Sequence, residues 1–163
     1  MPAPDPSADT KLLVASLREA GEIARRYYGG KYKTWHKSYG NPVSDADIEI
    51  DRFLKKNLLA QRPDYGWLSE ETEDDLARRS RVRIFVVDPI DGTYGFLKQR
   101  PQFTIVAAVV ENGRPVSAAC TAYEKRRPRS VPSPNKRSKR GASWGVVMIK
   151  MSRIPANMRV ARG

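Results

Sequence analysis

Two short segments of the chain combine acidic side chains with neighbouring apolar residues. The first is 69–72 (SEET), and the second is 88–93 (DPIDGT), which directly follows the apolar run 84–87 (IFVV). A carboxylate immediately after a buried strand lies at the C-terminal edge of that strand, where layered α/β folds bind their ligands. We therefore expect Asp88 and Asp91 to fold around one point at that edge.

The oxygen-only character of this cluster indicates a hard divalent cation. Two carboxylates about 4 Å apart repel each other by about 4 kcal/mol at an effective dielectric of 20, so several converging carboxylates need a cation to stay ionised. Because no His or Cys cluster accompanies them, Mg²⁺, Ca²⁺ or Mn²⁺ is favoured over Zn²⁺. Mg²⁺ is the usual choice where phosphate oxygens complete the coordination shell.

Two further residues of the second segment suit a phosphate group. Gly92 lets the backbone approach a ligand closely. Thr93 offers a hydroxyl and an N–H group, and backbone amides at the start of a helix or turn favour an anion. Taken alone, Glu70-Glu71 is typical of a solvated loop, Asp88-Pro89 of a turn and Asp47 of a helix cap. The occurrence of two Asp, a Gly and a Thr in six residues after a core strand favours a metal or phosphate site.

Two amphipathic helices are expected to support this site. Apolar residues at helical spacing predict a helix over 8–28, which Gly29-Gly30 ends. A second helix is predicted to begin at Ser44, because Ser44 and Asp47 fit a capping box, and Pro63 follows its end.

Strands are predicted at 65–69, 84–87, 103–110 and 116–120, whereas 31–43 looks irregular or weakly extended. The continuous apolar run 84–87 suits a strand that is buried on both faces, and Pro89 should end it because proline cannot donate a ladder hydrogen bond. Asn112-Gly113 is a strong signal for a hairpin turn. Helices and strands alternate first and strands then run together, which predicts an α/β fold, an α+β layered sandwich with helices packed on a mixed sheet.

Charge divides the chain into two parts. The net charge of the 163 residues is +12, but residues 121–163 contain 4 Lys, 8 Arg and 1 Glu, which leaves only +1 for the first 120 residues. We expect an N-terminal α/β domain at 1–120 that carries the metal and phosphate motifs, followed by a basic, disordered tail at 121–163. Within that tail, 144–149 is a short apolar stretch that could form a strand.

Localisation is predicted from what the sequence lacks. It has no run of 18 apolar residues, and its first residues show neither a basic n-region nor an apolar h-region. We therefore expect neither a transmembrane helix nor a signal peptide. The single cysteine, Cys120, cannot form an internal disulfide, which agrees with a reducing compartment. A cytoplasmic protein with no membrane partner is expected.

The segment from about Lys37 to Ala119 resembles the inositol monophosphatase superfamily. The shared motifs are 41–47 (NPVSDAD), 67–72 (WLSEET) and 87–93 (VDPIDGT), and the likeness continues at Phe96 and 103–107 (FTIVA). The DPIDGT element together with the upstream SEE is far more specific than either part alone. The NPVSDAD element is most similar to the bacterial 3′(2′),5′-bisphosphate nucleotidase (CysQ-like) branch.

The resemblance implies the truncated fold of such a phosphatase and a Mg²⁺-dependent phosphomonoesterase activity on a small phosphorylated metabolite. The metal ligands carried over from the family are Glu70, Asp88, the carbonyl of Ile90, and Asp91. Backbone amides of Gly92 and Thr93 would hold the phosphate. Asp47 and the Thr93 hydroxyl would orient and activate the attacking water, with Glu70 completing the catalytic set.

The resemblance leaves substrate and assembly open. Inositol phosphates, bisphosphate nucleotides and histidinol phosphate are all handled within the superfamily, and a homodimer is possible because family members often dimerise. The likeness also stops near Cys120. The family's site needs a later Asp in a Trp-Asp-x-Ala type motif, but no Asp follows Asp91 and Trp144 precedes a glycine.

Two alternatives to an active phosphatase follow. The resemblance covers roughly the first half of such a protein, and the composition of 121–163 is that of an out-of-frame segment, so the chain could be an inactive truncated remnant. The basic tail could instead bind nucleic acid non-specifically and with a steep salt dependence. No motif for specific nucleic-acid binding appears.

Overall fold

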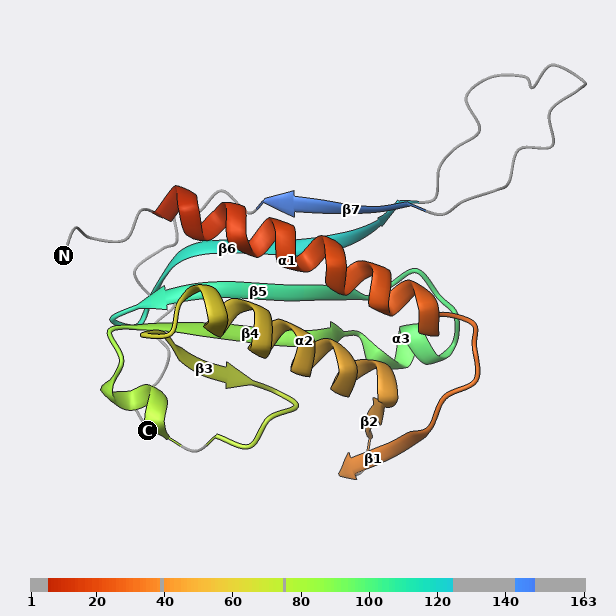
Figure 1. Ribbon diagram of the computed structural model, residues 1–163. Coiled ribbons are helices and arrows are strands. Elements are labelled where there is room, and N and C mark those ends of the chain that lie inside the picture. The colour runs from red at the N-terminus through yellow and green to blue at the C-terminus, as the bar shows by residue number, and fades with distance from the viewer. Residues whose placement is uncertain (1–5, 39, 75, 125–142, 149–163) are drawn as a thin grey trace, which may run out of the picture.

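A five-stranded mixed sheet with two helices on one face forms the body of the protein (Figure 1). The computed structural model describes residues 6–38, 40–74, 76–124 and 143–148. The strands lie in the order β3 (Gly66–Ser69), β4 (Arg83–Asp91), β5 (Thr104–Glu111), β6 (Arg114–Glu124) and β7 (Ser143–Met148). β3 runs parallel to β4, and all other neighbours are antiparallel. The predicted class, helices packed on a mixed sheet, is confirmed.

Two long helices bury their apolar stripes against this sheet. α1 (Pro6–Tyr27) packs on β5 and β6, and α2 (Asp45–Gln61) packs on β4 and α1. The side chains that each helix buries completely recur at helical spacing: Leu13, Leu17 and Ala20 in α1, and Ile50, Leu54 and Leu58 in α2. Each buried Leu or Ile stabilises the fold by about 1.5–3 kcal/mol. Among the described residues, no helix is long and apolar enough to cross a bilayer.

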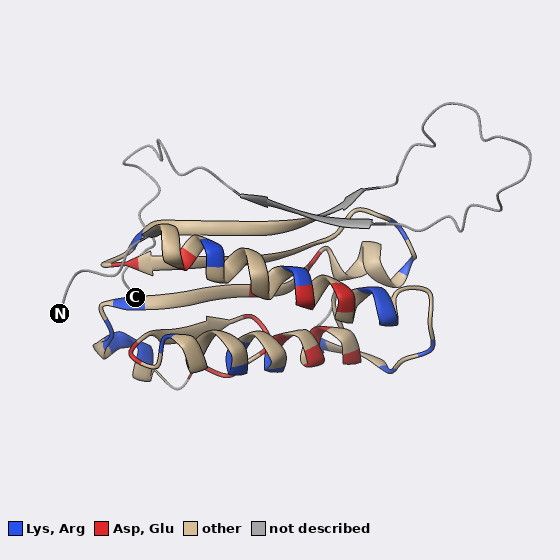
Figure 2. Cartoon of the chain, turned by 45° about the horizontal axis from the view of Figure 1, so that its top comes forward, with Lys and Arg blue, Asp and Glu red and all other residues tan. Residues whose placement is uncertain are grey.

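The start of α2 is fixed by its own side chains. The backbone N–H of Ser44 donates to Oδ2 of Asp47 at 2.8 Å, and the Ser44 hydroxyl donates to the same oxygen at 2.5 Å. This capping box was predicted. The acidic residues of α2 precede its basic residues along the helix (Figure 2), and the helix dipole favours the two carboxylates in its first turn, Asp45 and Asp47. The helix therefore begins with Asp47 held in one orientation.

β4 differs from the prediction in two ways. Only alternate side chains of 84–87 are buried, namely Phe85 and Val87, because within the described part of the chain the helices cover a single face of the sheet. The strand also passes Pro89 and reaches Asp91. The pairing register with β5 shifts there, so the missing N–H of the proline falls at an irregularity of the ladder.

Two segments form more strand than predicted. Residues 31–43, expected to be irregular or weakly extended, contain most of a hairpin of β1 (Thr34–Ser38) and β2 (Asn41–Ser44). β6 continues past Cys120, and most of the apolar stretch 144–149 lies in β7 beside it, so the boundary placed at residue 120 falls inside the sheet. The remainder of the basic tail, and with it the question of nucleic-acid binding, lies outside the described residues.

A buried polar network connects the start of α1 to the sheet. The carboxylate of Asp9, fully buried, accepts hydrogen bonds from Arg62 at 2.9 Å, from the Tyr65 hydroxyl at 2.9 Å and from Arg83 at 3.1 Å. Arg83 also donates to Glu111 at 3.0 Å. Since every charge has a partner, the network holds α1, α2 and β4 together at the end of the sheet where β4 begins.

Candidate active site

An acidic cavity of about 250 Å³ lies at the end of β4, beside the β1–β2 hairpin. The residues that line it are Lys37, Gly40, Asn41, Pro42, Val43, Glu70, Glu71, Asp88, Ile90, Asp91, Gly92, Thr93 and Tyr94. All the residues predicted to bind metal or phosphate thus line one cavity. Asp47 is buried behind it and reaches it through Thr93.

Parallel pairing of β3 with β4 brings the two acidic segments together. Ser69 is the register partner of Val87, so Glu70 and Asp88 directly follow the last pair of residues that joins β3 to β4. Asp51 of α2 holds the first segment in place, because it accepts hydrogen bonds from the hydroxyls of Ser69 and Thr72. The sheet register and the helix therefore position the two acidic segments beside each other.

Asp88 carries the clearest electrostatic signature of the site. Burial is the largest cause that raises its pKa, from 3.8 to about 7, and the negative charges of Glu70 and Asp91 add to it. The charges of Asp47 and Glu71 raise it further, to a smaller extent. A carboxyl whose pKa is raised toward 7 by burial and like charges is typical of functional sites. A bound cation would relieve the repulsion between the carboxylates.

Asp47 and Thr93 form a hydrogen-bonded pair beside the carbonyl of Ile90. The Thr93 hydroxyl lies 3.2 Å from Oδ1 of Asp47 and 2.9 Å from the Ile90 oxygen, so its single hydrogen can be donated to either. Burial raises the pKa of Asp47, although its bonds to Ser44 act against that rise. Asp47 is thus a buried proton acceptor whose only described route to the cavity is the Thr93 hydroxyl.

Gly92 makes the sharp turn between β4 and the short helix α3 (Thr93–Leu97). Its φ is +88°, and a Cβ at this position would lie 2.8 Å from the carbonyl oxygen of Gln102. Only glycine fits both the left-handed conformation and the close approach. The turn places the Thr93 hydroxyl over Ile90 and Asp47.

A comparison with protein families shows which family the chain belongs to. The model of the inositol monophosphatase family matches residues 5–128. The chain belongs to the inositol monophosphatase family. The match extends eight residues beyond Cys120, where the resemblance was expected to stop.

Curated relatives share this part of the chain. An inositol-1-monophosphatase from Rhizobium meliloti is 34% identical over 115 residues, which are 69% of this chain and 42% of the relative. The 3′(2′),5′-bisphosphate nucleotidase CysQ from Aggregatibacter actinomycetemcomitans is 33% identical over 106 residues, 64% of this chain and 39% of the relative. A Streptomyces griseus protein named glucose-1-phosphate thymidylyltransferase is 39% identical over 93 residues, 57% of this chain and 36% of the relative. The CysQ-like branch is therefore one of several at similar identity.

A solved structure supports the same fold. An inositol monophosphatase from Thermotoga maritima superposes with a TM-score of 0.62 at 26% identity, covering 70% of this chain and 43% of that one. The chain spans about two fifths of the length of the relatives it matches.

Two residues that contact the acidic segment 69–72 were missed from the sequence. The Lys37 ammonium on β1 lies 2.6 Å from the Glu71 carboxylate and donates to the Glu70 carbonyl at 2.5 Å. No sequence signal distinguished Lys37, because the hairpin that carries it has no clear strand pattern. Asp51 had a usable signal, since it follows Asp47 by four residues and so shares the same face of the helix.

The donor set of the cavity fits a hard divalent cation. Its oxygens come from the carboxylates of Glu70, Asp88 and Asp91 and from the carbonyl of Ile90, which is the ligand chemistry that Mg²⁺ prefers. Within the described residues, no three His, Cys, Asp or Glu side chains are already arranged as a closed metal cluster. Lys37, which also lines the cavity, forms an ion pair with the adjacent Glu71 carboxylate.

Proposed function

We propose that this chain is a Mg²⁺-dependent phosphomonoesterase that hydrolyses a small phosphorylated metabolite by attack of a water molecule. The observation that carries the proposal is the arrangement of Asp47, Thr93 and Asp88 around one cavity. The Asp47 carboxylate, a proton acceptor, lies behind the Thr93 hydroxyl, and Thr93 lines the same cavity as Asp88, whose pKa is raised to about 7. Family membership supports the same chemistry.

Asp47 and Thr93 would activate the water. When the Thr93 hydroxyl donates to Oδ1 of Asp47, its oxygen is left as an acceptor for a water in the cavity. As the water attacks phosphorus, its proton passes to the Thr93 oxygen and the threonine proton passes to Asp47. The raised pKa of Asp47 makes it a stronger base than an ordinary carboxylate.

Glu70, Asp88, Asp91 and the carbonyl of Ile90 would hold the cation. Bound there, Mg²⁺ would neutralise the carboxylates and stabilise charge on the phosphate oxygens. The backbone amides of Gly92 and Thr93 would orient the phosphate against the water. Positioning and charge neutralisation would then provide the rate enhancement without a covalent intermediate.

Relatives suggest the substrates to test, an inositol phosphate or a 3′(2′),5′-bisphosphate nucleotide. The name of the Streptomyces griseus relative denotes nucleotidyl transfer instead. The Asp47–Thr93 pair favours hydrolysis, because it provides a proton path for a water nucleophile.

The test is phosphate release from inositol-1-phosphate and from adenosine 3′,5′-bisphosphate, with and without Mg²⁺. We expect Mg²⁺-dependent release from at least one substrate, and loss of about 10²–10⁴-fold in rate in the Asp47→Asn variant. Asp64→Asn, which changes an exposed carboxylate away from the cavity, is the matched control. No Mg²⁺-dependent release from either substrate would reject the proposal and favour an inactive family remnant.

A further inference from the structure

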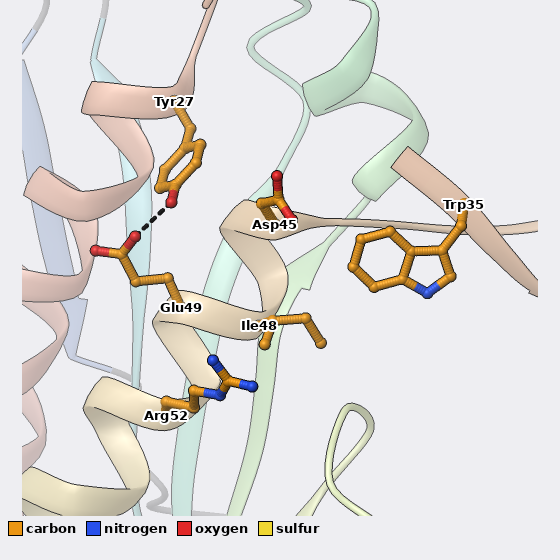
Figure 3. A pocket seen from close by; sticks show the side chains of 6 residues that line it. All are labelled: Tyr27, Trp35, Asp45, Ile48, Glu49 and Arg52. Carbon is orange, nitrogen blue, oxygen red and sulfur yellow. Dashed lines mark hydrogen bonds between the residues drawn. The ribbon is translucent and has the colours of Figure 1, made fainter. Parts of the chain in front are cut away.

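A second, larger cavity lies against the face of α2 that carries Asp45, Ile48 and Glu49 (Figure 3). Its volume is about 510 Å³, within the range of small-molecule sites. The residues that line it are Tyr27, Trp35, Asp45, Ile48, Glu49 and Arg52. Four of them form one face of α2, with Tyr27 of α1 on one side and Trp35 of β1 on the other. It shares no residue with the catalytic cavity.

The acidic groups of this cavity are largely satisfied from within the chain. Both oxygens of Glu49 are engaged, one by the Tyr27 hydroxyl and one by Arg26 at 2.7 Å. Oδ2 of Asp45 accepts the backbone N–H of Lys33 at 2.8 Å. Hence Glu49 has little capacity left for a ligand, whereas Asp45 keeps one oxygen.

Besides the second oxygen of Asp45, two side chains of the cavity are available to a ligand. The Trp35 side chain is 41% exposed, and no ring contact covers it in the part of the chain that the structure describes. Arg52 is exposed, and its guanidinium forms no ion pair or hydrogen bond with any described residue. Figure 3 shows the Arg52 side chain extending toward Ile48, with Trp35 across from it.

We propose that this cavity is a ligand site for a small aromatic anion, a nucleotide monophosphate whose base carries an amino group. The flat indole of Trp35 offers a surface on which a nucleotide base can stack. Stacking of a base on an aromatic side chain contributes about 1–3 kcal/mol to binding. The free guanidinium of Arg52 matches a phosphate through charge-assisted, bidentate hydrogen bonds. The remaining oxygen of Asp45 accepts from the amino group of the base, and Ile48 contributes apolar surface.

A simple cation fits the cavity less well than this ligand. The carboxylate of Glu49 is already neutralised by Arg26, and Arg52 would repel a positive charge. The ligand would also touch both elements that frame the catalytic cavity. Trp35 lies two residues before Lys37 on β1, and Asp45 lies two residues before Asp47 on α2. A bound nucleotide would therefore hold the hairpin against the helix.

The test is binding of adenosine 5′-monophosphate to the full chain in EDTA, measured by isothermal titration and by tryptophan fluorescence. EDTA suppresses Mg²⁺-dependent turnover, so the result does not depend on the proposed hydrolysis. We expect saturable binding with quenching of Trp35, and about tenfold or greater weakening in Arg52→Gln and in Trp35→Ala. Lys56→Gln removes the same charge from an exposed position on the same helix outside the cavity and should bind as the wild type does.

Three results would overturn the proposal. One is the absence of saturable binding. Another is equal affinity of the wild type and Arg52→Gln, which would place the nucleotide elsewhere. The third is binding of adenosine as tightly as its monophosphate, which would show that Arg52 does not receive a phosphate.

Discussion

Replacing Asp88 by asparagine should stabilise the metal-free protein while removing its activity. The pKa of Asp88 is raised from 3.8 to about 7, a difference that corresponds to about 4 kcal/mol. Because Asp88 is only half-buried, we halve this figure to about 2 kcal/mol for solvent screening. Because the folded-state pKa of Asp88 lies above its unfolded-state value, the ionised form of Asp88 destabilises the native state. This destabilisation is absent at pH below 3.8 and grows as pH rises through about 7.

Urea unfolding in EDTA, followed by circular dichroism at pH 5 and pH 8, measures this effect. We expect the free energy of unfolding of Asp88→Asn to exceed that of the wild type by about 2 kcal/mol at pH 8 and by under about 1 kcal/mol at pH 5. Asp64→Asn, on an exposed surface, should show no such difference. If Asp88→Asn were no more stable than the wild type at pH 8, or if its advantage did not change with pH, the electrostatic argument would be refuted.

Three further outcomes follow from the same structure. Mg²⁺ should raise the thermal midpoint of the wild type at pH 8, by binding only the folded state, and should have little effect on Asp88→Asn. Gly92→Ala should lower the free energy of unfolding in urea by about 1–3 kcal/mol, because its Cβ would lie 2.8 Å from a backbone carbonyl oxygen. The control Gly40→Ala has a similar φ but open space around it, and its free energy of unfolding should fall by less. Asp9→Ala should lower the free energy of unfolding by about 3–5 kcal/mol, since it removes one of the two carboxylates paired with the buried Arg83 and the buried acceptor of Arg62 and Tyr65; an unchanged urea midpoint would show that the network does not stabilise the fold.

The residues of the candidate site that the sequence predicted are those in continuous motifs. The arrangement of DPIDGT depends on local sequence alone, because a strand end, a glycine turn and a threonine hydroxyl follow one another along six residues. The same was true of Ser44 and Asp47, whose capping box needs only local contacts. Lys37 reaches Glu71 across 34 positions of sequence, and such a contact depends on how the hairpin packs, which no local pattern specifies.

The burial of side chains was predicted less well than the positions of the helices and strands. The apolar run 84–87 indicated a strand correctly, but its burial depends on what covers each face of the sheet. The helices lie on one face in the described part of the chain, so Ile84 and Val86 stay half-buried while Phe85 and Val87 are buried. The apolar stretch 144–149 could not be placed from its own composition either, because pairing with β6 decides its strand structure.

β4 joins two charge clusters of opposite character. At its first residue, Arg83 meets Asp9 and Glu111, so that buried charges of opposite sign are paired. Five residues further, about 17 Å along the strand, Asp88 faces the like charges of Glu70 and Asp91, which raise its pKa. Such a conflict is expected at a functional site, where local rules are violated and the rest of the fold compensates. The paired end can supply the stability that the acidic end loses, because the two clusters lie too far apart to share partners. Asp88→Asn and Asp9→Ala should therefore act additively, and a double variant whose stability departs from the sum by more than about 0.5 kcal/mol would show that the ends of β4 are coupled.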